Sequence, residues 1–155
     1  MGGKKHGGKR ICLDDAEALY EHIYNLLEER VDWIALAGSA RRQKPEVGDL
    51  DIVLVPRSER TKEVATEIFG SPTGGLYDGI QVDLVYVSPG SEGTALMHST
   101  GSSMENMRLR RKAKRLGLKL NQYGLWQDNL NLAHGLSEEQ IYNALGEPYV
   151  RPEDR

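Results

Sequence analysis

The sequence contains a single cysteine, Cys12, among its 155 residues, and it lacks a long apolar run. One cysteine excludes an intramolecular disulfide and a zinc site built from several thiolates, and it suits a reducing compartment. The longest apolar run, residues 33–37, is far shorter than the roughly 20 residues that a membrane-spanning helix needs. The basic start is not followed by the apolar segment of a signal peptide, so we expect a cytoplasmic protein with no membrane partner.

Acidic and basic residues are unevenly distributed along a chain whose formal net charge is −3. Residues 101–120 hold seven lysines and arginines against one glutamate, and residues 1–10 carry four further cations. Residues 121–155, in contrast, hold six acids against two arginines. This asymmetry indicates a polyanion site on an otherwise acidic protein, with a solvated helix face as the alternative.

The hydrophobic pattern predicts helices that alternate with strands, and hence a mixed α/β or α+β fold. The expected caps are Asp14 or Asp15 for the first helix, Ser39 for a short helix, and Ser137 with Gln140 for the last helix. Residues 71–75 are expected to form a loop. The predicted helices cover residues 16–27, 59–69, 103–116 and 137–145, and the predicted strands cover 33–37, 49–55, 80–87, 118–120 and 124–127.

Three aspartates stand out because they lie within otherwise apolar strands. Asp49 and Asp51 alternate with Leu50, so both carboxylates point to one face of the strand. Asp83 is the only acid of the strand at 80–87, and the three carboxylates converge if the two strands pair. Such a cluster is costly to bury unless a cation neutralises it, and hard oxygen ligands suit Mg²⁺ or Mn²⁺. Two such ions would support phosphoryl transfer, whereas solvent-facing strand positions are the alternative interpretation.

The segment before the first two aspartates has the features of a phosphate-binding loop. Gly38 follows a strand and allows a backbone to approach a phosphate closely. Ser39 and the adjacent amides offer hydrogen-bond donors at the start of a helix, and Arg42 can bind a phosphate oxygen with its guanidinium. The arrangement predicts a triphosphate on one side of the site and metal ions on the other.

These motifs resemble the nucleotidyltransferase superfamily in the form found in family X DNA polymerases, the DNA polymerase beta group. The resemblance rests on GSARRQKPEVGDLDIVLV, IQVDLVYV, HSTGSSMENMRLRRKAKRLGLKLNQYGLW and LSEEQIYNALGEPYVRPEDR, and it covers roughly residues 10–155. It implies an α+β fold in which a palm, a mixed sheet with flanking helices, precedes a small α/β thumb-like subdomain. We therefore expect a flexible basic N-terminus over residues 1–10, a palm over 11–92 and a thumb over 93–155.

The resemblance also implies roles for individual residues. Asp49, Asp51 and Asp83 match the metal-binding and catalytic aspartates, and Asp83 is the candidate base for a primer 3′-hydroxyl. Positions 103, 106, 107 and 110 share one helix face, which leaves neighbouring cations free for phosphates. The expected nucleotide-binding residues are Gly38, Ser39, Arg42, Gly48, His98, Ser99, Thr100, Gly101 and Asn106. The expected DNA-binding residues are Arg110, Arg111, Lys114 and Arg115.

The sequence departs from the family pattern at several points. His98-Ser99 replaces the Tyr-Phe pair that helps exclude a ribose 2′-hydroxyl, so weak sugar discrimination is expected. Gln122 and Ser103 stand where acids are common. Neither the lyase domain of the family nor its duplex-gripping segment precedes the palm, so we expect no lyase activity, weak DNA affinity and low processivity, with the N-terminal cations as a partial substitute.

The leading hypothesis is a minimal DNA polymerase, similar to bacterial members, that fills short gaps during repair. It would bind gapped or primer-template DNA and a (d)NTP, would use two Mg²⁺ ions for which Mn²⁺ can substitute, and would act as a monomer beside a ligase or an end-binding repair protein. The first alternative is a template-independent nucleotidyltransferase that acts on a nucleic-acid end or a small acceptor. The second is a nucleic-acid-binding module without catalysis.

Overall fold

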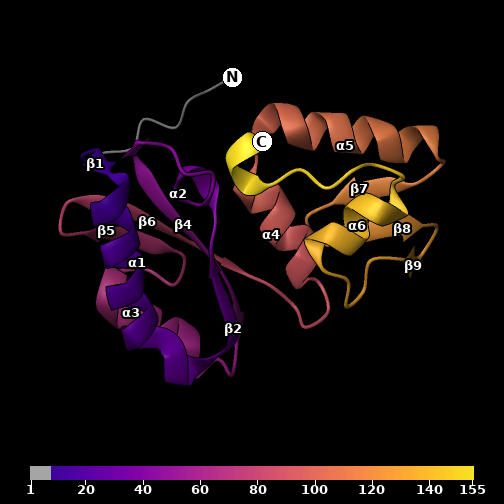
Figure 1. Ribbon diagram of the computed structural model, residues 1–155. Helices are drawn as coiled ribbons and strands as arrows, with labels where there is room; N and C mark the ends of the chain where they lie inside the picture. The colour runs from indigo at the N-terminus through magenta and orange to yellow at the C-terminus, as the bar shows by residue number, and fades with distance from the viewer. Residues whose placement is uncertain (1–7) are drawn as a thin grey trace.

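The computed structural model describes residues 8–155, so most of the expected basic N-terminus lies outside the described part of the chain. The chain forms two regions that lie side by side (Figure 1). We use "palm region" for residues 11–92 and "thumb region" for residues 93–155, the boundaries expected from the sequence. No helix in the described residues is both long and apolar enough to cross a membrane.

The palm region is built on a four-stranded mixed sheet of order β2-β4-β6-β5. The two central strands, β4 (Asp49–Pro56) and β6 (Ile80–Tyr86), are parallel, and the outer strands β2 (Val31–Leu36) and β5 (Gly74–Tyr77) pair antiparallel to them. The predicted α+β architecture with a mixed sheet is therefore confirmed. Strand β4 carries the β-branched residues Ile52, Val53 and Val55, and its residues 52–55 are all buried, as expected of a central strand that is covered on both faces.

The helices of the palm region pack on the apolar side of β4. The helices α1 (Leu13–Leu27) and α3 (Arg60–Phe69) share one buried core with Leu50, Ile52 and Leu54. Val53 and Val55 alternate with these residues and join Ala37 and Ala95 in a second core. The remaining elements are short: β1 (Ile11–Cys12), which pairs with β3 (Glu46–Val47), η1 (Glu28–Arg30) and α2 (Gly38–Arg41).

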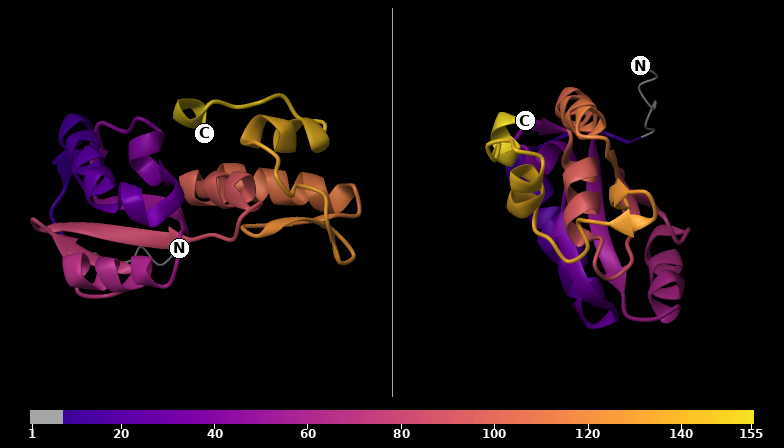
Figure 2. Two further views of the ribbon diagram at one scale, coloured as in Figure 1. Left: turned by 90° about the horizontal axis from the view of Figure 1, so that it is seen from below. Right: turned by 90° about the vertical axis from the view of Figure 1, so that its right-hand side faces the viewer.

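The thumb region has its own apolar core. It consists of α4 (Glu92–Thr100), α5 (Ser103–Arg115), the three-stranded sheet β7 (Lys119–Asn121), β8 (Gly124–Gln127) and β9 (Leu130–Asn131), α6 (Glu138–Ala144) and η2 (Pro152–Asp154). Leu109, Leu125 and Ile141 are fully buried at its centre. Helix α4 belongs to both cores, because Ala95 packs with the palm residues and Met97 with the thumb residues. Figure 1 shows α4 between the palm sheet and the other thumb elements, and the left view of Figure 2 shows the two regions side by side from below.

Several expected details of the secondary structure are wrong. Helix α1 begins at Leu13, so Asp14 and Asp15 lie in its first turn, where carboxylates favour the helix dipole, instead of capping it. Ala37 is the N-cap of α2, which places Ser39 inside that helix. The predictions omitted α4, β5 and β9, and Gly74–Tyr77 is a strand where a loop was expected to end. The strand β2 is only half-buried because it forms an edge of the sheet. The capping box of Ser137 and Gln140 and the pairing of β7 with β8 are confirmed.

Candidate active site

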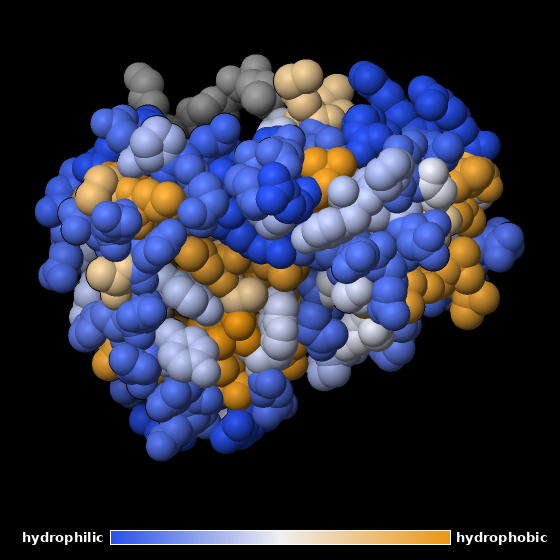
Figure 3. Space-filling view, viewed as in Figure 1, coloured by the Kyte–Doolittle hydropathy of each residue, from blue (hydrophilic) through white to orange (hydrophobic). Residues whose placement is uncertain are grey.

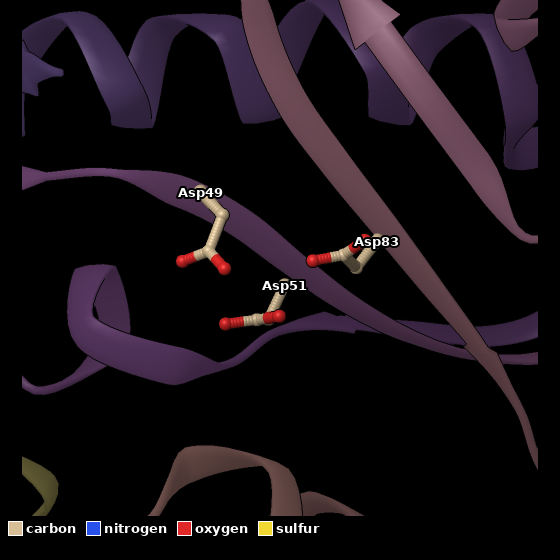
Figure 4. Close-up of side chains that lie close together, drawn as sticks. All are labelled: Asp49, Asp51 and Asp83. Atoms are coloured by element: carbon tan, nitrogen blue, oxygen red, sulfur yellow. The ribbon is translucent and has the colours of Figure 1, made fainter. Parts of the chain in front are cut away.

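Asp49, Asp51 and Asp83 meet at the centre of the palm sheet. The parallel register of β4 and β6 places Asp51 directly opposite Asp83, so the strand pairing on which the expected convergence of the three carboxylates depended is present. One carboxylate oxygen of each residue lies within 4.8 Å of the others, and all three side chains are partly exposed. Figure 4 shows the three carboxylates gathered on one side of the two strands. The strand register thus creates an acidic cluster that is open to solvent.

The donor set of this cluster fits a divalent metal. Three carboxylates so close together repel one another, and a hard cation removes that repulsion. Oxygen-only ligands with room for water are the environment that Mg²⁺ and Mn²⁺ prefer. The cluster is therefore a candidate site for one or both of these metals, held by Asp49, Asp51 and Asp83.

Gly38 brings the start of α2 against Asp51. Its φ of +65° lies in the left-handed region, and a Cβ atom at this position would collide with the Asp51 carboxylate. Only glycine satisfies both constraints without strain. The phosphate-binding loop predicted from the sequence therefore lies directly beside the acidic cluster.

A cleft of about 460 Å³ separates the palm and thumb regions at this point. Its volume lies within the usual range for small-molecule sites. The palm wall is formed by Gly38, Ser39, Arg42, Asp49 and Asp51, and the thumb wall by His98, Ser99, Gly101, Ser102, Ser103, Asn106, Met107 and Arg110. Most of the residues predicted to bind the nucleotide thus line a single cleft.

Two predicted nucleotide-binding residues lie elsewhere. Thr100 is fully buried behind the cleft wall, and Gly48 lies just before β4, outside the lining. Ser102, which the family resemblance places in a Thr-Gly-Ser turn against the sugar, lines the cleft as well. Ser103 and Met107 also line it although the predicted site did not include them, and the helical spacing of positions 103, 106, 107 and 110 was the signal that could have added both.

Arg42 presents a cationic group to the cleft. Its Nη1 donates a hydrogen bond to the carbonyl oxygen of Thr100 at 2.5 Å, and its buried Nε has no hydrogen-bond partner among the described residues. Burial lowers the pKa of Arg42, while the charge of Asp51 raises it. An arginine remains protonated under these conditions, so Arg42 combines a positive charge with an unused donor, as an anion ligand requires.

His98 and Asn106 form a hydrogen-bonded thumb wall with Arg110. Arg110 Nη2 lies 2.9 Å from His98 Nδ1, and Asn106 Nδ2 donates to the carbonyl oxygen of His98 at 2.9 Å. Because a guanidinium can only donate, His98 Nδ1 must accept, which requires a neutral imidazole with its proton on Nε2. Burial and the charge of Arg110 both lower the pKa of His98, in agreement with that protonation state.

Two contacts beside the cleft were not predicted from the sequence. Arg41, the neighbour of Arg42, turns away from the cleft and donates to Thr100 Oγ1 and to the buried carboxylate of Glu138. Gln81 Nε2 donates to Asp83 Oδ1 at 3.0 Å. The contact of Arg41 has no local sequence signal, because Arg41 and Glu138 are far apart in the chain. Gln81 and Asp83, in contrast, are two residues apart on one face of β6, and this spacing could have indicated their contact.

The remaining predicted DNA-binding residues lie on the exposed surface of α5. Arg111, Lys114 and Arg115 are solvent-exposed and lie outside the lining of the cleft. Figure 3 shows a strongly hydrophilic surface over α5. Arg108 differs from them because Glu105 and Glu147 pair with it.

An acidic cluster on a mixed palm sheet, facing a basic thumb helix across a cleft, defines a nucleotidyltransferase-like protein. Residues 95–155 match the model of the DNA polymerase beta thumb. The chain is 26% identical over 167 residues to the repair DNA polymerase X of two African swine fever virus isolates, with 96% of each chain covered. The thumb region thus matches the DNA polymerase beta thumb family, and the whole chain is similar to proteins named repair DNA polymerase X.

Solved structures share the fold. Polymerase beta of Leishmania infantum in a ternary P/T complex matches with a TM-score of 0.80 and 21% identity, over 95% of this chain and 77% of that one. The same polymerase in a ternary gap complex matches with a TM-score of 0.76 and 20% identity, over 95% and 71% of the two chains.

Proposed function

We propose that this protein is a DNA polymerase that adds a nucleotide from a (d)NTP to a DNA 3′-hydroxyl with the help of two divalent metal ions, and that it fills short gaps during repair. The observation that carries the proposal is the carboxylate cluster of Asp49, Asp51 and Asp83 at the mouth of the palm–thumb cleft. The match to the DNA polymerase beta thumb and the similarity to relatives named as repair polymerases support it.

The chain supplies distinct groups for each part of this reaction. Mg²⁺ or Mn²⁺ held by the three aspartates would activate the attacking hydroxyl and stabilise the charge of the leaving pyrophosphate. Asp83 would accept the proton of the primer 3′-hydroxyl at a carboxylate oxygen. Arg42 and Ser39 would hold the triphosphate, since both line the cleft beside Asp51. Positioning and electrostatics then account for most of the rate, as in phosphoryl transfer generally.

The thumb wall would bind the base and the template strand. Asn106 and Arg110 lie on the cleft side of α5, where a templated base pair would meet them. The two structural neighbours were crystallised as P/T and gap complexes, which supports primer-template or gapped DNA as the partner of this chain.

Weak sugar discrimination is part of the proposal. The cleft beside Gly101 is lined by His98 and Ser99, and no tyrosine, phenylalanine or tryptophan lines it within the described residues. A flat aromatic wall that would exclude a 2′-hydroxyl is therefore missing from this lining. We expect ribonucleotides to be incorporated at rates comparable with deoxyribonucleotides.

Primer extension on a one-nucleotide gapped duplex tests the function, with each dNTP and NTP supplied separately in Mg²⁺ or Mn²⁺. The Asp51→Asn variant should lower the rate roughly 1,000-fold or more, because several kcal/mol of metal-derived stabilisation is lost. Asp78→Asn is the matched control: Asp78 is exposed, lies just before the neighbouring strand β6 and has a φ of +50° that asparagine tolerates.

Extension by only the complementary nucleotide, lost in Asp51→Asn and kept in Asp78→Asn, would support a templated polymerase. Extension that ignores the template would instead favour the template-independent transferase. No extension, or equal activity in both variants, would contradict the proposal.

A further inference from the structure

The outer face of the thumb sheet carries a tryptophan that does not belong to the apolar core. In the β7–β8 register, Lys119 lies opposite Trp126, and Leu120 lies opposite Leu125. Leu120 and Leu125 are buried in the thumb core, so the alternation places Lys119, Asn121 and Trp126 on the opposite face. Trp126 is only partly buried there.

The indole ring is held in a fixed orientation. Its Nε1–H donates to Asn121 Oδ1 at 3.1 Å, and the same oxygen accepts from the backbone N–H groups of Tyr123 at 2.9 Å and Gly124 at 3.1 Å. Three donors therefore converge on one side-chain oxygen and anchor the ring to the tight β7–β8 turn. A ring fixed in this way loses little conformational entropy when a planar group stacks on it.

Trp126 lines a hollow on this outer face. The hollow has a volume of about 490 Å³, and its lining is mainly polar: Gly117, Leu118, Lys119, Asn121, Trp126, Asp128 and Asn129. Arg115 at the end of α5 and Lys119 at the start of β7 are both exposed at the junction that leads into it. An aromatic ring beside amide groups and cations is the combination that binds single-stranded nucleic acid.

The hollow and the cleft are linked through one residue. His98, Asn106 and Arg110 line the cleft, and the same three residues line a small recess next to it together with Asn121. Asn121 also lines the hollow. Asn121 therefore lies between the predicted base-binding wall and Trp126.

We propose that this hollow binds the unpaired template strand beyond the templating base. Trp126 stacks on one of its bases, and Lys119 contacts a neighbouring phosphate. The inference rests on the proposed function, because the cleft must hold a templated base pair for its extension to hold the next template nucleotides.

Two DNA substrates with the same primer terminus distinguish this site from the cleft itself. One is a primer-template with a long single-stranded 5′ template overhang. The other carries in addition a downstream strand that anneals stably to that overhang and leaves a one-nucleotide gap. We expect Trp126→Ala to weaken binding to the overhang DNA about tenfold, measured by fluorescence anisotropy, because stacking on one base is lost. Binding to the gapped DNA should remain within about twofold of the parent protein.

Further variants separate stacking and charge from loss of fold. Trp126→Phe should retain most of the affinity for overhang DNA, and Tyr24→Ala, which removes an exposed aromatic residue of the palm region, should change neither affinity. Lys119→Gln should reduce the salt dependence of overhang binding by about one phosphate contact.

Three results would overturn the inference. Equal losses on both DNAs in Trp126→Ala would assign the residue a merely structural role. Unchanged binding of overhang DNA in that variant would show that no base stacks on the ring. Failure of the parent protein to bind either DNA would overturn the proposed function as well, so the two failures can be told apart.

Discussion

The palm region holds its functional groups on paired strands, whereas the thumb region places them on one face of a helix. In the palm, Asp51 and Asp83 are cross-strand partners, and hydrogen bonds between β4 and β6 fix their separation. In the thumb, Asn106 and Arg110 are one helical turn apart on α5, and the helix alone fixes their spacing. The spacing of the side chains within each wall of the cleft therefore does not depend on the other wall.

The palm and thumb regions are joined by contacts that lie outside the two cleft walls. Helix α4 joins both cores, and Arg41 of α2 reaches across to Glu138 of α6. Arg155 Nη1 donates to the same carboxylate at 2.6 Å, and its guanidinium lies near the rings of Tyr142 and Tyr149. The candidate catalytic groups thus lie on regular elements, whereas an ion network around the buried Glu138 joins the two regions.

The largest expected effect comes from breaking that junction. Glu138→Gln would leave Arg41 and Arg155 without their buried counter-charge, and we expect a loss of about 3–5 kcal/mol in the free energy of unfolding. Urea denaturation measures it, with Trp33 and Trp126 as reporters of the two regions. Glu139→Gln changes the exposed neighbour and should stay close to the parent protein. Equal stability of the two variants would contradict a role for the network.

A second variant acts on the palm wall alone. Gly38→Ala would push a Cβ atom into the Asp51 carboxylate at a φ of +65°. We expect kcat/KM for nucleotide addition to fall about 100-fold, because a displacement of about 1 Å at a reacting centre has that effect. Gly70→Ala is the matched control, since its φ of +90° is equally unfavourable but no atom lies within 4 Å of the added Cβ. Equal losses of activity in both variants would attribute the effect to backbone strain.

The smallest expected effect is a pH dependence of stability that comes from His98 in the thumb wall. The fold lowers the pKa of His98 through burial and Arg110, so the unfolded chain binds this proton more tightly. The contribution of His98 to the free energy of unfolding is therefore fully present above about pH 6.5, the pKa of histidine in the unfolded chain. This contribution is lost as the pH falls from there through the lower pKa of His98 in the folded protein. The difference in unfolding free energy between the parent protein and His98→Gln should therefore shrink below pH 6.5. His134→Gln, at an exposed position, serves as the control, and a pH-independent difference for His98→Gln would contradict the assignment.

Local patterns predicted much of this architecture. Alternation around Leu50, the lone acid in the strand at 80–87 and the capping box of Ser137 each depend on neighbours within a few residues. These patterns place side chains on a face or begin a helix whatever the rest of the chain does. The acidic cluster followed from them once the two strands paired.

Other features escaped prediction because their partners are distant in sequence. Helix α4 mixes glycine, threonine and serine with a few apolar residues and has a weak helical pattern, yet burial against two cores stabilises it. Asp14 and Asp15 had good capping chemistry, but the pairing of β1 with β3 fixes Cys12 as the N-cap of α1. Packing overrode a local preference in both cases.

The sequence by itself determined the chemistry of the acidic cluster, the helical face of α5 and the resemblance to family X DNA polymerases. Only the tertiary structure decided that Arg41 turns away from the cleft to Glu138, that Thr100 lies behind the cleft wall and that Asn121 hydrogen-bonds to Trp126. The physical reason is the distance along the sequence over which each effect acts. Periodicity and helix capping depend on residues a few positions apart, whereas the partner of a buried charge can lie in a distant segment that folding brings within hydrogen-bond distance.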